Sequence, residues 1–323
     1  MKNFFYILLF NIICCFLIII PGCDFAEIKQ KSVTGESTVY VDENLEPLLN
    51  DFKTEFEKEY KEAKIHFVVK PAKVIMTELI NGDIKDAMVA RDFNQEEEDF
   101  IKKKSLEVKK YELAFDGIGF IVNPFNPAER LTSDDLKKIF TGEYTKWSQI
   151  TVQDEEQNVN IKKKMTGRND EIKVYIQRPN SSAYELVKDS VLYGAEFLQS
   201  AKICSTSVQM LESVRKFENS IGIINLAWLT VGRQDILDST VNALRISKIT
   251  PTGRQYDFEI FHQGTVAYKK YPYIRKVFYL STEFAITTSE GFVSFLLKPG
   301  GQKIFLNKGL VPRTQPVRLI QIE

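Results

Sequence analysis

Arg178 stands four positions ahead of Ser182 in the stretch IQRPNSSAYELV, residues 176–187, at a predicted helix start. Ser182 and Glu185 have the spacing of a capping box, in which the two side chains satisfy backbone N–H groups of the first helical turn. A guanidinium at the same end is more than a cap requires, and a helix N-terminus with hydroxyls and an arginine suits an oxyanion. The residues alone fit two interpretations: an anion site, or an Arg178 salt bridge beside a capping box.

The N-terminus has the features of a lipoprotein signal. Residues 1–22 join a short polar start to an apolar run, and Cys23 follows Gly22 as in a bacterial lipobox, where the cysteine is acylated. The alternative is a single transmembrane anchor, for which the run is slightly short. We expect a signal peptide over 1–22 and a lipidated N-terminus and linker over 23–36. The folded domain would then be lipid-anchored at the cell envelope, in the periplasm or on the cell exterior.

Composition limits the classes of function. The 323 residues are 44% hydrophobic and 27% charged, enough for one large or two medium folded domains. Lys plus Arg and Asp plus Glu both number 43, so no global positive field indicates a nucleic-acid partner. Any anion binding must therefore depend on local groups.

Few residues could hold a metal or perform nucleophilic catalysis. Cys204 is the one thiol outside the predicted signal and lipidation site, so no internal disulfide is expected. His66 and His262 are the two histidines, and neither belongs to a Cys/His cluster. We expect no metal, no cofactor and no catalytic residue, and thus not an enzyme.

Strand and helix patterns alternate at the start of the folded region. Strands are predicted at residues 38–41, 64–70 and 86–91, and helices after the N-cap Asp42 and over 74–82. This β-α-β-α-β order is typical of a doubly wound sheet with a parallel core.

Similar patterns continue toward the C-terminus. A helix is predicted between the capping box of Thr132 with Asp135 and Gly142. The polar stretch 151–170 is expected to be a solvated excursion such as a hairpin. The other predicted strands are 112–124, 171–178, 220–229, 258–270 and 275–282, and the other helices are 182–194 and one on each side of Pro299-Gly300-Gly301.

Six segments resemble, in order, motifs of phosphate-transport substrate-binding proteins, the PstS family. They are DAMVARDF (86–93), DGIGFIVNPFNPAERLTSDDLKKIFTGEYTKWSQI (116–150), IQRPNSSAYELV (176–187), NSIGIIN (219–225), YPYIRKVFYLST (271–282) and FVSFLLKPGGQKIFLNKGLVP (292–312). The resemblance runs from about residue 38 to 313, nearly the whole predicted mature chain.

This resemblance implies an α/β type II periplasmic-binding-protein fold, in which two α/β lobes enclose a ligand cleft. One lobe would hold residues 37–121 plus 266–323 and the other residues 122–265. The crossing strands would have hinges near Asn123 and Gly264. An open α/β sheet independently predicts a ligand at the carboxyl ends of its strands.

By resemblance, Arg178 and Ser182 match the loop arginine and serine of the family. Arg91 fits both an anion ligand and an inter-lobe salt bridge, and Lys73 fits both a ligand and a surface residue. The predicted phosphate- or anion-binding residues are Arg178, Ser182, Ser181, Arg91, Asn44 and Lys73.

Two early loops depart from the family pattern. Val41-Asp42-Glu43-Asn44 stands where the family shows G-S-T-T, and Pro71-Ala72-Lys73 stands where it shows G-S-G. The carboxylates of Asp42 and Glu43 could cap the first helix, but they would repel an anion unless one is protonated or accepts a proton from the ligand.

The leading expectation is a substrate-binding lipoprotein that captures inorganic phosphate or a related oxyanion for an ABC importer, without covalent chemistry. Its partners would be the anion, the membrane subunits of the importer and, through its lipid, the membrane. The alternative is a degenerate binding-protein fold that acts as an envelope interaction or sensing subunit and binds no phosphate.

Overall fold

The structure, a computed structural model, describes residues 33–165, 170–232, 236–284 and 287–314. The predicted signal peptide, the lipidation site Cys23 and most of the linker lie outside the described residues. Within those residues, no helix is long and apolar enough to cross a bilayer.

The first lobe is built on a parallel arrangement, as the sequence predicts. Strand β1 pairs in parallel with both β2 and β3. The strands of this lobe are β1 (Gly35–Asp42), β2 (Ala63–Lys70) and β3 (Asp86–Val89). The helices are η1 (Glu43–Leu48), α3 (Leu49–Glu59), α4 (Ala72–Asn81), α5 (Gln95–Lys104), α12 (Thr288–Leu297) and α13 (Pro299–Asn307).

The second lobe repeats this arrangement, with β8 and β7 parallel to β6 on its two sides. Its strands are β5 (Arg130–Thr132), β6 (Lys173–Gln177), β7 (Lys202–Cys204), β8 (Ser220–Asn225), β9 (Asn242–Ala243) and β10 (Arg245–Ser247). Its helices are α6 (Ser133–Thr141), η2 (Trp147–Gln149), α7 (Glu155–Met165), α8 (Ser182–Ser190), α9 (Ser207–Lys216), α10 (Leu226–Leu229) and α11 (Gln263–Ala267).

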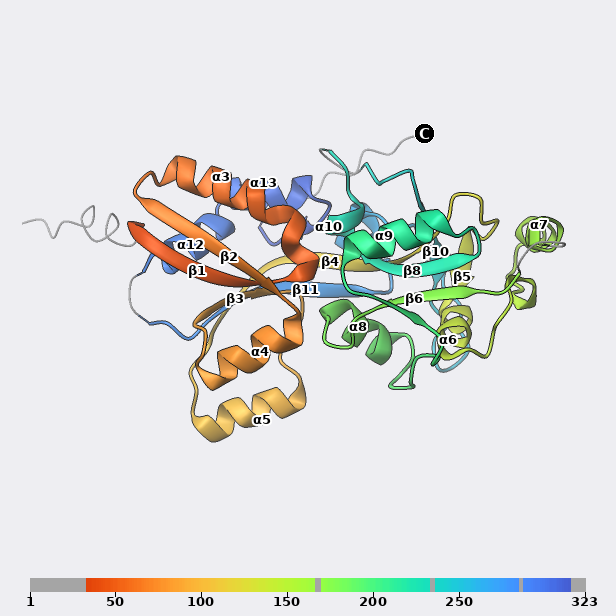
Figure 1. The fold of residues 1–323 in the computed structure, drawn as a ribbon, viewed down its shortest axis with the longest axis horizontal. Coiled ribbons are helices and arrows are strands. Elements are labelled where there is room, and N and C mark those ends of the chain that lie inside the picture. Colours follow the sequence, from red (N-terminus) through yellow and green to blue (C-terminus); the bar gives the residue numbers. More distant parts are fainter. Residues whose placement is uncertain (1–32, 166–169, 233–235, 285–286, 315–323) are drawn as a thin grey trace, which may run out of the picture.

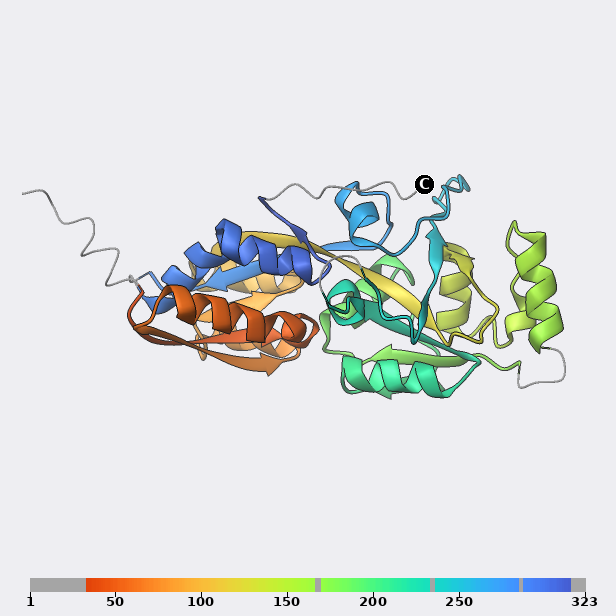
Figure 2. The same cartoon turned by 90° about the horizontal axis from the view of Figure 1, so that it is seen from above.

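Two antiparallel strands connect the lobes, β4 (Lys109–Val122) and β11 (Ile274–Ser281). They run between the two groups of elements in Figures 1 and 2. β4 also pairs with β8 and with the short β12 (Val311–Pro312), so one sheet continues through both lobes in the order β2-β1-β3-β11-β4-β8-β6-β7.

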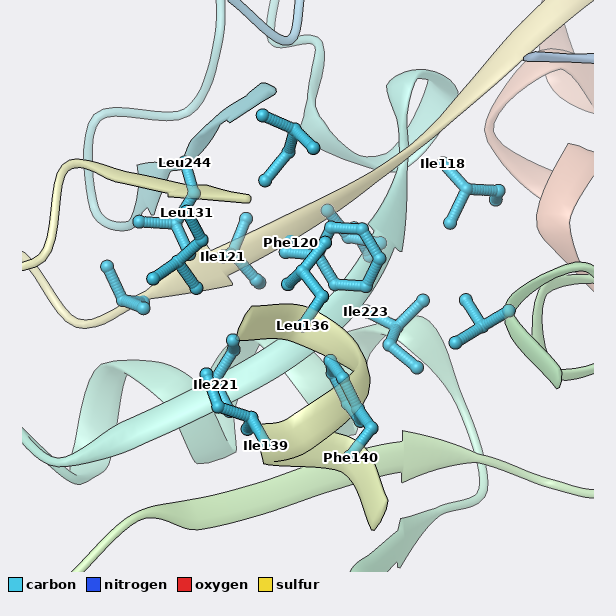
Figure 3. Packing of buried hydrophobic residues seen from close by; sticks show 14 of the residues in the cluster. Ile118, Phe120, Ile121, Leu131, Leu136, Ile139, Phe140, Ile221, Ile223 and Leu244 are labelled. Carbon is cyan, nitrogen blue, oxygen red and sulfur yellow. The ribbon is translucent and has the colours of Figure 1, made fainter. Parts of the chain in front are cut away.

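Each lobe has its own core. In the second lobe, apolar side chains of β4, β8 and α6 point toward one another, with Phe120, Phe140 and Ile223 among them (Figure 3). In the first lobe, Phe52 lies 4.9 Å from Phe305, ring centroid to ring centroid, within a cluster of aromatic rings. A second, smaller cluster of the first lobe includes Ile75, Leu79 and Phe278.

Glycine shapes the connecting strand β4. A Cβ atom on Gly119 would lie 2.4 Å from the ring of Phe261 in the second-lobe core. The glycine therefore lets the α11 region pack directly on the strand.

Several sequence predictions of elements are confirmed. The helix after Asp42 begins where that side chain accepts a hydrogen bond from the Asn44 N–H group. α4 ends at Gly82 in the left-handed conformation. Thr132 and Asp135 form the predicted capping box of α6.

Three predicted elements are wrong. Residues 155–165 form α7 rather than part of a hairpin, because Ile161 and Met165 lie one turn apart and are both buried. The strand predicted at 258–270 is replaced by α11, which contains Gly264, so this residue does not lie on a crossing strand. The strand predicted at 220–229 ends at Asn225 and continues as α10.

Candidate functional site

Polar residues of both lobes meet where parallel strands end. Asp42 ends β1, Ala90 follows β3, Arg178 follows β6 and Asn225 ends β8. The carboxyl ends of parallel strands are the usual position of ligand sites in open α/β sheets.

The carboxylate of Asp42 is at the centre of this region and is fully buried. Its Oδ1 accepts hydrogen bonds from the N–H and the side-chain amide of Asn44, both at 3.0 Å. Its Oδ2 accepts from the Ala90 N–H at 3.2 Å and from the Ser182 hydroxyl at 2.6 Å. Four donors around one carboxylate form the type of environment that a dehydrated oxyanion requires.

The Ser182 hydroxyl uses its full hydrogen-bonding capacity. It donates to Asp42 and accepts from the Asn44 amide at 3.2 Å and from Arg275 Nη1 at 2.8 Å. A hydroxyl has one proton to donate and two lone pairs to accept with. Ser182 therefore has no hydrogen left for a further acceptor while Asp42 is in place.

Ser181, not Ser182, caps helix α8. Its hydroxyl accepts from the Tyr184 N–H at 3.1 Å, and Glu185 forms no capping box. The predicted Ser182–Glu185 capping box is therefore wrong by one residue. The cause is a tight turn in which the Ser181 N–H donates to the Arg178 carbonyl at 2.9 Å, which brings Ser181 to the helix start.

A buried ion pair supports the centre from the crossing strands. Arg275 of β11 donates to Asp116 Oδ2 of β4 through Nε at 3.0 Å and Nη2 at 2.8 Å. Asn225 joins this pair to the first lobe, since its amide donates to Asp116 and to the Asn44 carbonyl, both at 3.0 Å. Burial raises the pKa of Asp116 and Arg275 acts to lower it.

Sequence reasoning missed Asp116, Asn225 and Arg275 as site residues. All three lie within motifs that carry the family resemblance. Asp116 is also a charged residue inside the apolar run ELAFDGIGFIV, and it faces Arg275 in the strand register. A charge in such a run is rarely buried without a partner, and this was the signal available in the sequence.

Arg178 pairs with Glu43 across the lobes. Burial raises the pKa of Glu43, and Arg178 acts in the opposite direction. Trp228 of the second lobe donates to the Glu43 backbone carbonyl at 3.1 Å, a second contact between the lobes at this residue. Arg178 Nε is buried and has no hydrogen-bond partner within the described part of the chain.

Arg91 forms the inter-lobe salt bridge that was one of its two predicted roles. Its Nη1 and Nη2 donate to Glu97 at 2.7 and 2.6 Å, and its Nε lies 2.9 Å from Glu185 Oε2 of the second lobe. Burial raises the pKa of Glu185 to about 7 because desolvation outweighs Arg91, whose charge Glu97 also neutralises.

Lys73 contacts the second lobe through its backbone. Its N–H donates to the Asn180 carbonyl at 3.1 Å, and its side chain is exposed. The side chain lines a groove of about 880 Å³ that reaches Ser182 and Arg275 between the lobes. Ala90 and Ser182, which both donate to the Asp42 carboxylate, line this groove.

A model of the PBP superfamily domain matches residues 29–299. This chain belongs to the PBP superfamily. Among its relatives, the phosphate-binding protein PstS of Borreliella burgdorferi is 22% identical over 88% of this chain and 90% of that protein. PstS of Staphylococcus aureus strain RF122 is 21% identical over 83% of this chain and 74% of that protein.

Solved structures with the same fold include phosphate receptors. A Clostridium perfringens substrate-binding protein with bound phosphate gives a TM-score of 0.69 at 20% identity, over 86% of this chain and 99% of that one. An ABC-type phosphate transport receptor from Vibrio cholerae gives 0.62 at 18% identity, over 86% and 100%. The predicted type II binding-protein fold and the likeness to PstS are both confirmed.

In this PBP superfamily member, the six predicted anion-binding residues divide by position. Asn44 and Ser182 donate to the Asp42 carboxylate, and Ser181 caps α8. Arg91 and Arg178 pair with acidic residues, and the Lys73 side chain is exposed at the groove. The described residues hold no group of three or more His, Cys, Asp or Glu side chains that could bind a metal.

Proposed function

We propose that this chain is the substrate-binding component of an ABC importer and captures phosphate or a related oxyanion without covalent chemistry. The lobes that close on the anion are residues 37–121 plus 266–323 and residues 122–265. A lipid on Cys23 would tether the domain to the membrane beside the importer subunits. The phosphate-binding relatives support this proposal.

One observation carries the proposal: the cleft already holds an oxyanion group. The Asp42 carboxylate is dehydrated and bound by donors of both lobes, with Asn44 and Ala90 on one side and Ser182 on the other. A phosphate in the same place would meet the same donors. Arg178 lies at the same helix start, and its buried Nε is able to donate to such a ligand.

Calorimetry on residues 24–323 with phosphate, sulfate and molybdate tests this function. We expect one anion per chain, and Arg178→Ala should weaken binding by about 2 kcal/mol or more, because a guanidinium desolvated against a ligand is lost. Arg254→Ala is the matched control, since Arg254 is exposed. Tight binding that Arg178→Ala leaves unchanged would contradict the site.

A second candidate function, an envelope interaction or sensing subunit, has its own supporting observation. Arg178 and Arg91, the two arginines expected to bind the anion, already pair with Glu43 and with Glu97 and Glu185. This candidate predicts no binding of phosphate, sulfate, molybdate or small carboxylates. It also predicts that an envelope protein co-purifies with the full-length chain.

A further inference from the structure

We propose that Asp42 is an intramolecular ligand of the cleft. Its carboxylate occupies the oxyanion position and holds the lobes closed, and a free oxyanion binds only by displacing it. We infer the closure of the lobes from contacts within this chain. The competition with a free anion rests on the proposed function.

The position of Asp42 leaves its carboxylate few alternatives. Asp42 is the last residue of β1 and the N-cap of η1, so its short side chain is held on the cleft wall by its own backbone. All four hydrogen bonds that it accepts are internal to the protein, and the residue is fully buried. The carboxylate therefore replaces solvent with protein donors, as a captured ligand would.

Occupancy by Asp42 excludes a second oxyanion. The one proton of the Ser182 hydroxyl is directed at Asp42 Oδ2, and the Ala90 N–H is directed at the same oxygen. A free anion could obtain these donors only after the carboxylate moves away. Two negative groups at adjacent positions would also repel each other in this buried region.

Further contacts within the chain join the lobes around this centre. Glu43 of the first lobe pairs with Arg178 of the second, and Arg91 of the first pairs with Glu185 of the second. The Lys73 N–H donates to Asn180 across the same boundary. In a binding protein that opens when empty, the ligand supplies the contacts that stabilise the closed state. Here the protein supplies them.

Removal of the Asp42 carboxylate should therefore open the cleft and release its donors. In Asp42→Ser the hydroxyl can still cap η1 but carries no charge. Asp42→Asn keeps the size and the capping ability of the side chain and also removes the charge. Asp154→Asn is the matched control, because Asp154 caps α7 through the Gln157 N–H and pairs with Arg130, but lies on the second lobe away from the cleft.

The test combines small-angle X-ray scattering with phosphate calorimetry on residues 24–323 of each variant. We expect the wild-type chain and Asp154→Asn to have the same compact radius of gyration with and without phosphate. The radius of gyration of Asp42→Ser should be larger without phosphate and should decrease when phosphate is added. Its affinity for phosphate should be at least tenfold higher than that of the wild type. If Asp42→Ser does not fold, as judged by circular dichroism, Asp42→Asn provides the same comparison.

The outcomes separate this inference from the proposed function. If the Asp42 variants open but no variant binds any oxyanion, the result supports Asp42 as an intramolecular ligand and contradicts the proposed transport function. If the wild type binds phosphate tightly and the Asp42 variants bind it more weakly or stay as compact as the wild type, the inference is overturned and the transport function stands.

Discussion

At the scale of single residues, the protonation of each charged group in the cleft depends on its burial and on the partners around it. The Asp116–Arg275 pair is buried in the crossing strands, where two hydrogen bonds and the Asn225 amide compensate for its desolvation. Glu185 is also desolvated, and Glu97 already neutralises much of the charge on the neighbouring Arg91. Burial raises the pKa of Glu185 to about 7, so this residue should respond to pH near neutrality.

Glu185 should make stability depend on pH. Burial raises its pKa from 4.5 to about 7, with Arg91, Glu97, Lys73 and Asp42 as the charged groups around it. Between these values the folded protein binds a proton that the unfolded chain has lost. This contribution is complete below pH 4.5 and is lost as pH rises through about 7. The free energy of unfolding should therefore fall from pH 5 to 8.

Urea unfolding of the wild type and of Glu185→Gln, measured across that pH range, tests this assignment. The glutamine cannot ionise, so the variant should lose part of the pH dependence, while the contributions of the other buried carboxyl groups remain in both proteins. Equal pH slopes in the two proteins would show that Glu185 does not titrate in this window.

At the scale of elements, two neighbouring serines at the start of α8 have different roles. Ser181 caps the helix, while Ser182 reaches the Asp42 carboxylate in the other lobe. Ser181→Ala should cost about 1 kcal/mol, the usual value of an N-cap. Ser182→Ala should cost about 1.5 to 3 kcal/mol, because it removes a hydrogen bond to a charged group.

A double-mutant cycle distinguishes these two roles. Ser182→Ala and Asp42→Asn should be coupled by about 1 kcal/mol or more, whereas Ser181→Ala and Asp42→Asn should add to within about 0.5 kcal/mol. Chemical unfolding of the wild type, the three single variants and the two double variants provides the measurement. Equal coupling for both serines would contradict the division of roles.

The elements show why sequence patterns predicted the fold better than the site. Periodic apolar positions and caps such as Thr132 and Gly82 are local, and they marked most helices and strands. The polar stretch that forms α7 lacks a long apolar stripe, so it was missed. The site depends on contacts between residues far apart in sequence: Arg178 pairs with Glu43, and Ser182 donates a hydrogen bond to Asp42. No local pattern specifies which of several possible partners a charge will take.

At the scale of the whole molecule, the question is whether two lobes close without a ligand. The lobes have separate cores, and polar contacts join them across the cleft. Such contacts are weak one by one when exposed to water. They act together only while the boundary stays closed, so the equilibrium between open and closed forms is sensitive to the loss of one central group.

Hydrogen exchange of two adjacent amides should report this equilibrium. The Lys73 N–H donates across the lobe boundary to Asn180 at 3.1 Å, whereas the Val74 N–H donates within its own lobe to Pro71 at 3.0 Å. If the cleft is closed without a ligand, the Lys73 amide should be protected in the wild type. In Asp42→Ser its exchange should become at least tenfold faster, while Val74, the internal control, should change little. An unprotected Lys73 amide in the wild type without any anion would mean that the lobes are open in solution, and the cleft would then depend on an external ligand for its closure.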